Sequence, residues 1–266
     1  MSVDKPLSIA MYGATGRMGT RIIQLLTEDS SLVLGAAIDR PDHPKLGQDA
    51  GEPIGVGTLG VWLSCDLPQQ GVDVVIDFTS PQATLSLVKK CAEARIPLVV
   101  GTTGFEPEQK LELESYASQI PIFISANFSK AVNLLFKLAG EAAKALGDSA
   151  DIEIVERHHH FKKDAPSGTA LKIADVVAKA IGSTTFVHGR SGLTGERPKG
   201  EIGIHALRTG DNPGEHTVVF GLMGECLEIS HRALNRDGFA RGALDAAKFL
   251  AGKPPGLYSM HDLLDS

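Results

Sequence analysis

Three consecutive histidines lie in the segment richest in reactive side chains, residues 156–170, which reads ERHHHFKKDAPSGTA. A metal site is one interpretation of such a run. Side chains alternate along a strand, however, so His158 and His160 would point one way and His159 the other. Zinc sites need thiolate or carboxylate partners at suitable spacing, and no cysteine is near. We therefore predict no metal site and expect a histidine to act as proton donor or polar anchor near neutral pH.

Lys162 follows His158 by four residues. In a continued strand the two side chains would lie about 13 Å apart, too far to contact one small molecule. If both act, the chain must bend after His160, and the sequence DAPSG at residues 164–168 is typical of a turn.

That turn opens a predicted helix over residues 170–181, with Ser167 as its cap. The first N–H groups of the helix, near Gly168 and Thr169, form a ready site for a carboxylate. Histidines, a lysine and a helix N-terminus in one segment favour a small anionic substrate. The structural alternative is a capped helix beside a solvated basic loop.

A second group of chemically useful residues is the glycine loop at residues 13–19, GATGRMG, between a predicted strand and a helix. Small residues here let the backbone approach a pyrophosphate, which then binds the free N–H groups of the helix. The spacing departs from the usual G-x-G-x-x-G. The order of elements supports the interpretation, because Asp39 follows Gly19 by 20 residues, where a carboxylate binds the adenosine ribose. The alternative is a turn that serves only helix packing.

Arg40 follows Asp39 directly. A carboxylate favours the free 2′-hydroxyl of NAD, whereas a guanidinium favours the 2′-phosphate of NADP. The pair therefore predicts that either NADH or NADPH is accepted. A surface salt bridge between the two side chains is the alternative.

Two further loops follow predicted parallel strands: residues 101–104, GTTG, and residues 125–128, SANF. Ligands of open α/β sheets bind outside the carboxyl ends of the strands. We expect these loops to line the nicotinamide side of the cofactor, unless they are simple connections.

The elements that must position these residues alternate in the first half of the chain. Apolar runs predict five strands, at residues 7–12, 33–38, 72–78, 98–100 and 121–125, with helices between them. This order implies a parallel, doubly wound sheet of the Rossmann type. Residues 1–129 are predicted to form a dinucleotide-binding domain.

After residue 130 the pattern changes to an α+β domain. Helices are predicted at 131–146 and 170–181, a strand starts at 151 and runs to 160, and residues 202–207, 216–220 and 226–231 resemble antiparallel strands. We assign 130–238 to a substrate domain with a mixed or antiparallel sheet. A last helix starts at 239, and residues 239–266 could return to the first domain.

Composition excludes several classes of protein. The 26 basic against 32 acidic residues give a net charge of −6, without the basic excess of a nucleic-acid-binding protein. No apolar run approaches the roughly 20 residues that span a bilayer. Three widely spaced cysteines fit neither a disulfide framework nor a zinc ribbon. We expect a soluble, cytoplasmic protein that binds neither nucleic acid nor membrane.

Taken together, these residues resemble the 4-hydroxy-tetrahydrodipicolinate reductase (dihydrodipicolinate reductase) family of bacteria and plants. The most specific match is the segment from Glu153 to Ala170, and the glycine loop matches in its unusual spacing. The resemblance extends over essentially the whole chain through four more segments: IDFT at 76–79, GTTGF at 101–105, ANFS at 126–129 and GEHT at 214–217.

The resemblance implies an activity and a set of roles. The activity is NAD(P)H-dependent reduction of a small dicarboxylate with loss of water, in the diaminopimelate route of lysine biosynthesis. His158 would be the proton donor and Lys162 a second one, while His159, Gly168 and Thr169 would hold the substrate's carboxylates. The adenine half of the cofactor would bind Gly13, Ala14, Thr15, Gly16, Arg17, Met18, Asp39 and Arg40, and the nicotinamide half Gly101, Thr102, Thr103, Ser125, Ala126, Asn127 and Phe128.

The family also implies a homotetramer formed through the sheet of the C-terminal domain, with the final helix packed on the nucleotide domain. One departure is that Asp39 stands where some members carry Glu. A different nicotinamide-dependent dehydrogenase of amino acids is the rival enzyme, and the histidine–lysine segment argues against it. A redox sensor that holds NAD(P)H without turnover is the rival from another class, and it would need an interaction module that the sequence lacks.

Overall fold

A computed structural model describes residues 5–266 of the chain, and these form two compact units. The first unit combines the described residues up to Ser129 with the segment Asp237–Ser266. The second unit is Lys130–Arg236.

The first unit is built on a seven-stranded sheet with the order β12-β6-β5-β4-β1-β2-β3, in which every neighbouring pair is parallel. The strands are β1 (Leu7–Tyr12), β2 (Leu32–Ile38), β3 (Leu63–Ser64), β4 (Val74–Asp77), β5 (Leu98–Val100), β6 (Pro121–Ile124) and β12 (Gly256–Tyr258). The strand order reverses between β1 and β4, the place where such sheets bind ligands. The predicted Rossmann-like sheet is confirmed.

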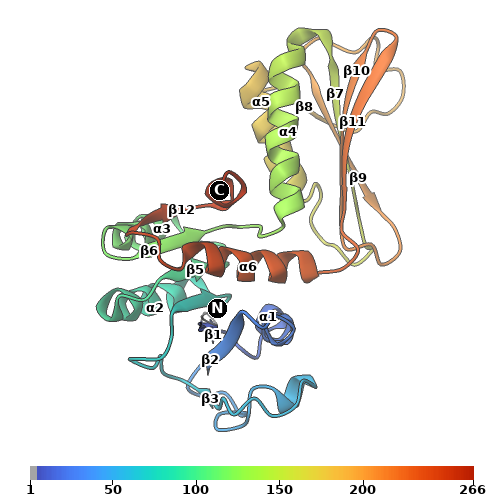
Figure 1. Ribbon diagram of the computed structural model, residues 1–266. Helices are drawn as coiled ribbons and strands as arrows, with labels where there is room; N and C mark the ends of the chain where they lie inside the picture. The colour runs from blue at the N-terminus through green and yellow to red at the C-terminus, as the bar shows by residue number, and fades with distance from the viewer. Residues whose placement is uncertain (1–4) are drawn as a thin grey trace. The chain divides into compact units, whose positions relative to one another are not determined.

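Helices cover both faces of this sheet, because its central strands are apolar on both sides (Figure 1). Met11 faces one core with α1 and α6, and its neighbour Ala10 faces the other with α2 and α3. The helices are α1 (Arg17–Thr27), α2 (Pro81–Ala94), α3 (Pro107–Ser115), α6 (Asp237–Leu250) and α7 (Met260–Leu264), with short 3-10 turns at Glu52–Ile54 and Tyr116–Ser118. The last long helix thus packs within the first unit, starting two residues before the predicted position.

The second unit is a five-stranded mixed sheet with the order β11-β10-β7-β9-β8, and α4 and α5 cover one of its faces (Figure 1). Its elements are α4 (Lys130–Leu146), a 3-10 turn (Gly147–Ser149), β7 (Asp151–His158), α5 (Gly168–Ile181), β8 (Phe186–His188), β9 (Ile202–Arg208), β10 (Glu215–Leu222) and β11 (Glu225–Arg232). The antiparallel interpretation of the strand at 202–207 was wrong. β9 runs parallel to β7 because α5 carries the chain back over the sheet between them, and it runs parallel to β8 because residues 189–201 return the chain between those two strands.

Strand β7 positions the residues of interest. Its even-numbered side chains face α4 and α5, and the first two, Ile152 and Ile154, lie in the apolar core. The next two on the same face are Glu156 and His158, which are also buried. A core-facing strand therefore ends in two polar side chains that need partners.

Among residues 5–266 we find no helix with the length and apolar character needed to cross a membrane.

Candidate active site

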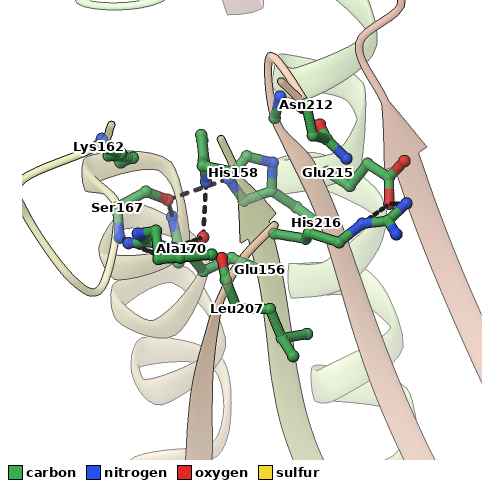
Figure 2. A network of polar contacts seen from close by, with 12 residues as sticks. Glu156, His158, Lys162, Ser167, Ala170, Leu207, Asn212, Glu215 and His216 are labelled. Carbon is green, nitrogen blue, oxygen red and sulfur yellow. Dashed lines mark hydrogen bonds and ion pairs between the residues drawn. The ribbon is translucent and has the colours of Figure 1, made fainter. Parts of the chain in front are cut away.

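Glu156 is the centre of a polar network in the second unit (Figure 2). Its side chain is fully buried, and each carboxylate oxygen accepts two hydrogen bonds. Oε2 accepts from His158 Nδ1 at 2.6 Å and from Arg208 Nη1 at 2.9 Å. Oε1 accepts from Arg208 Nη2 at 2.9 Å and from the backbone N–H of Ser167 at 3.0 Å. The carboxylate is thus satisfied by donors from three different elements.

The charge of Glu156 follows from these partners. Burial raises the pKa of a carboxyl group, but the hydrogen bonds from Arg208 and His158 outweigh burial and hold the pKa of Glu156 below its usual value. Glu156 is therefore ionised at neutral pH and acts only as an acceptor.

Gly214 lies against Nε2 of His158, the ring nitrogen that does not bind Glu156. It precedes β10 with φ of +151°, and a Cβ built on it would lie 2.9 Å from His158 Nε2. A side chain at this position would press on the nitrogen that does not bind Glu156. Glycine is required here by its small size, which explains one residue of the GEHT segment.

His216 lies edge-on to His158, with the ring centroids 5.2 Å apart. Its Nε2 is 3.1 Å from the hydroxyl oxygen of Ser167, and that oxygen accepts the N–H of Ala170 as the cap of α5. Burial and the nearby His158 lower the pKa of His216 to about 4, so this ring is neutral at pH 7. The predicted cap at Ser167 is confirmed, and α5 starts at Gly168.

Lys162 lies in the turn between β7 and α5. Its ammonium group bonds both carboxylate oxygens of Asp164 at 2.8 Å. The side chain is 19% exposed and thus mostly buried, although it lies in a loop. The turn also forms earlier than predicted: β7 ends at His158, and the Lys162 N–H bonds to the carbonyl of His159.

His159 and His160 therefore do not continue the strand, and the predicted alternation of the three side chains fails after His158. The backbone N–H groups of His159 and His160 instead bond to the carbonyls of Asn212 and Gly210, in the loop after β9. His159 is half-buried, and its Nδ1 has no hydrogen-bond partner among the described residues. No three histidine, cysteine, aspartate or glutamate side chains within residues 5–266 are grouped so that they could hold a metal ion.

The N-terminus of α5 remains open to a ligand. Its first residues are Gly168, which is exposed, and Thr169, which is half-buried, and the Ser167 hydroxyl oxygen caps the helix by accepting the N–H of Ala170. The helix spans 14 residues, long enough for its first N–H groups to attract an anion.

In the first unit, the glycine loop follows β1 at the point where the strand order reverses. Gly13 has φ of +83°, and a Cβ on Gly19 would lie 2.1 Å from the Gly13 carbonyl oxygen, so α1 could not pack so closely with a larger residue. Gly16 caps α1 without any side-chain bond. The N–H groups of Arg17 and Met18 at the start of α1 therefore have no side-chain acceptor from the cap.

Asp39 follows β2 and faces this loop. Its Oδ2 accepts the backbone N–H of Thr15 at 3.0 Å and the Thr15 hydroxyl at 2.7 Å. Burial raises the pKa of Asp39, but the bonds from Thr15 outweigh it and keep the pKa below its usual value. Arg40 points elsewhere, with Nε 3.3 Å from Asp42, so the alternative of an Asp39–Arg40 salt bridge was wrong.

The loop after β5 is held by a buried carboxylate that sequence reasoning missed. Asp77, the last residue of β4, accepts hydrogen bonds from the hydroxyls of Thr79 at 2.6 Å, Thr84 at 2.5 Å and Thr102 at 2.9 Å. The Thr102 hydroxyl in turn accepts the Thr79 N–H at 2.9 Å. This network fixes Gly101–Thr103 against the loop after β4, while Thr103 itself is exposed.

The loop after β6 is partly internal. The Ser125 hydroxyl donates to the Asn127 carbonyl at 2.7 Å, and Ala126 is exposed between them. The ring of Phe128 is 2% exposed and packs on Phe78 and Phe123. Any contact of Phe128 with a cofactor would therefore come from its backbone. Ala14 is similarly buried within its loop.

Glu156, Arg208, His216 and Gly214 were not among the predicted site residues. Glu156 had a detectable signal, because it stands two positions before His158 and strand alternation puts both on one face. Arg208 had none, because it meets this site only through the parallel pairing of β7 with β9, where it lies opposite His158.

Models of two protein-family domains match nearly the whole chain. Residues 7–128 match "Dihydrodipicolinate reductase, N-terminus" and residues 131–264 match "Dihydrodipicolinate reductase, C-terminus". Curated relatives named 4-hydroxy-tetrahydrodipicolinate reductase include those of Geotalea daltonii, 48% identical over 97% of this chain and 98% of the relative, and of an Anaeromyxobacter species, 49% identical over 97% of both.

Solved structures agree with this assignment. A dipicolinate-bound dihydrodipicolinate reductase from Paenisporosarcina sp. TG-14 is 26% identical, with a TM-score of 0.77 over 96% of this chain and 97% of that one. An amine dehydrogenase from Mycobacterium smegmatis, 15% identical with a TM-score of 0.66 over 97% of this chain and 96% of that one, shares the fold. The chain is an oxidoreductase with a Rossmann-like nucleotide-binding domain, and it belongs to the dihydrodipicolinate reductase family.

Proposed function

We propose that this protein acts in the cytoplasm as an NAD(P)H-dependent reductase. It converts 4-hydroxy-tetrahydrodipicolinate to tetrahydrodipicolinate with loss of water, in the diaminopimelate route of lysine biosynthesis. The observation that carries the proposal is the near-half identity with reductases of this name over 97% of the chain. The polar network around Glu156 and His158 is consistent with it.

The residues of the first unit fit a nicotinamide dinucleotide. The loop from Gly13 to Met18 brings the N–H groups at the start of α1, which have no side-chain cap, to a place where a pyrophosphate can bind, and Asp39 is held ionised and ready to accept from a ribose hydroxyl. Arg40 is exposed and reaches only Asp42, so it can meet a 2′-phosphate. Gly101–Thr103 and Ser125–Phe128 line the nicotinamide side. When bound, the cofactor supplies the hydride, and both NADH and NADPH are accepted.

The residues of the second unit fit a small dicarboxylate. The N–H groups at Gly168 and Thr169 and the side chain of His159 hold the two carboxylates, with the ammonium of Lys162 adding positive charge. Loss of the hydroxyl as water leaves an unsaturated ring imine, and hydride addition at its C4 moves electron density towards the ring nitrogen. The resulting enamine must take up a proton. His158 donates that proton and Lys162 is a second donor, because imidazole and ammonium side chains serve as general acids in proteins.

The proposal is tested by following the absorbance of NADH and of NADPH after adding substrate freshly made from pyruvate and aspartate semialdehyde. Loss of absorbance with both cofactors is expected, and pyridine-2,6-dicarboxylate should compete with the substrate. An enzyme that oxidises neither cofactor under these conditions is not this reductase.

We also propose a homotetramer formed through the sheet of the second unit. The face of this sheet turned away from α4 and α5 carries Val155, Val219 and Leu207, with Leu207 45% exposed. A surface of this kind is typical of an interface between subunits. Light scattering should give about four times the chain mass of 28.1 kDa, and a monomeric mass would contradict the proposal.

A further inference from the structure

The buried Glu156 fixes the proton on one particular nitrogen of His158. Because the carboxylate is ionised and can only accept, the short bond of 2.6 Å requires a hydrogen on Nδ1. The neutral ring therefore carries its lone pair on Nε2. This is the nitrogen next to Gly214, where a Cβ would lie only 2.9 Å away.

Arg208 completes this arrangement. Its guanidinium binds both oxygens of Glu156 and also donates to the backbone carbonyl of Asp164 at 2.6 Å. Asp164 is the residue that pairs with Lys162. The Glu156 carboxylate also accepts the N–H of Ser167, the cap of α5. One ion pair thus connects the strand end, the lysine turn and the helix N-terminus.

We infer that Glu156 is a positioning residue that holds His158 in its Nδ1–H form with Nε2 facing the reacting ring, and that Arg208 keeps Glu156 charged and in place. The inference rests on the proposed role of His158 as proton donor. Glu156 itself does not touch substrate or cofactor.

Glu156→Gln tests the role, because it keeps the size of the side chain while removing the charge. A glutamine amide can also donate to Nδ1, which would move the ring proton to Nε2. We expect turnover to fall roughly 10–10³-fold, with the KM changed less than about threefold and the NADH dissociation constant unchanged.

Glu153→Gln is the matched control on the same strand. Glu153 also binds two arginines, Arg190 and Arg197, and a histidine, His205, but on the opposite face of the sheet. Turnover per folded protein, with folding followed by circular dichroism, should stay within about threefold of the parent. If Glu156→Gln retains normal turnover, or loses no more than Glu153→Gln, the inference is wrong.

A second measurement applies even if Glu156→Gln does not fold. Nitrogen-15 chemical shifts of the histidine rings of the unmodified protein report which nitrogen is protonated, and the His158 signals are those missing from His158→Gln. For the neutral ring we expect a protonated Nδ1 and a bare Nε2; a neutral ring with its proton on Nε2 would overturn the inference. Because no substrate is present, this result stands apart from the proposed reaction: failure of the absorbance assay would refute the function and leave the ring state established.

Discussion

Within residues 5–266, each unit buries one carboxylate completely near the end of a strand, and the two carboxylates have different hydrogen-bond partners. In the first unit Asp77 accepts three threonine hydroxyls. In the second unit Glu156 accepts an arginine, a histidine and a backbone N–H. Both side chains are 0% exposed.

The electrostatic outcome is opposite. Burial raises the pKa of Asp77, and the hydroxyls of Thr79, Thr84 and Thr102 reverse only part of this effect. At Glu156 the guanidinium of Arg208 and the imidazole of His158 outweigh burial, so its pKa falls. Burial alone therefore does not decide the charge of a carboxyl group; a neighbouring cation does. Asp77 serves to fix the shape of a loop, for which neutral donors suffice, whereas Glu156 must be an anion to orient a histidine.

The largest effect on turnover should come from His158, the histidine that is hydrogen-bonded to Glu156. His158→Gln removes the proposed proton donor, so turnover should fall by roughly 10²–10⁴-fold, the range of general acid catalysis. The NADH dissociation constant should hardly change, because the loops that we propose to bind the cofactor belong to the first unit. Turnover, cofactor titration and thermal midpoint are measured together. Near-normal turnover, or a loss explained by unfolding alone, would remove His158 from the mechanism.

The two carboxylates should differ in how much each contributes to the free energy of unfolding. Glu156→Gln leaves the guanidinium of Arg208 without its counter-charge, so we expect the free energy of unfolding to fall by about 2–4 kcal/mol. Asp77→Asn leaves no charge behind and relieves the desolvation that raised the pKa, so the loss should be about 1 kcal/mol or less. Urea unfolding at neutral pH compares the two variants with the parent. An equal or larger loss for Asp77→Asn would contradict the comparison.

Acid should act on the two groups with opposite sign. The folded pKa of Glu156 lies below the unfolded value of 4.5, so its contribution to stability is present above pH 4.5 and is lost as pH falls through the folded pKa. The folded pKa of Asp77 lies above the unfolded value of 3.8, so the folded state takes up this proton first and gains stability as pH falls. Relative to the parent, Glu156→Gln should flatten the loss of stability in acid, and Asp77→Asn should steepen it.

Much of this could be predicted from sequence where the signal is local. The parallel sheet follows from alternating apolar runs, and the cap at Ser167 follows from its place before an apolar stripe. Strand pairing is not local: neither Arg208 beside Glu156 nor the parallel course of β9 has a pattern in its own segment. The buried role of Asp77 was also hidden, because its three partners come from two different loops and a helix.

Short elements were missed for a related reason. β3 has two residues and β8 and β12 have three each, too few to show a period. The early end of β7 at His158 depends on bonds from His159 and His160 to the loop after β9, which again lies far away in sequence. These are contacts between segments, and single-segment reasoning has no access to them.

The smallest expected effect concerns a third carboxylate, which has an arginine beside it in sequence but not in space. Asp39 is held by Thr15, and Arg40 reaches Asp42 instead. The side chains of Asp39 and Arg40 do not pair with each other, so each can bind its own part of a cofactor. Asp39 would then bind the ribose of either cofactor, and Arg40 only the 2′-phosphate of NADPH. Arg40→Ala should then weaken NADPH about tenfold, or about 1–2 kcal/mol, and leave NADH nearly unchanged. Fluorescence titration of both cofactors makes NADH the internal control, and equal losses for the two would show that Arg40 supports the fold of the loop rather than the phosphate.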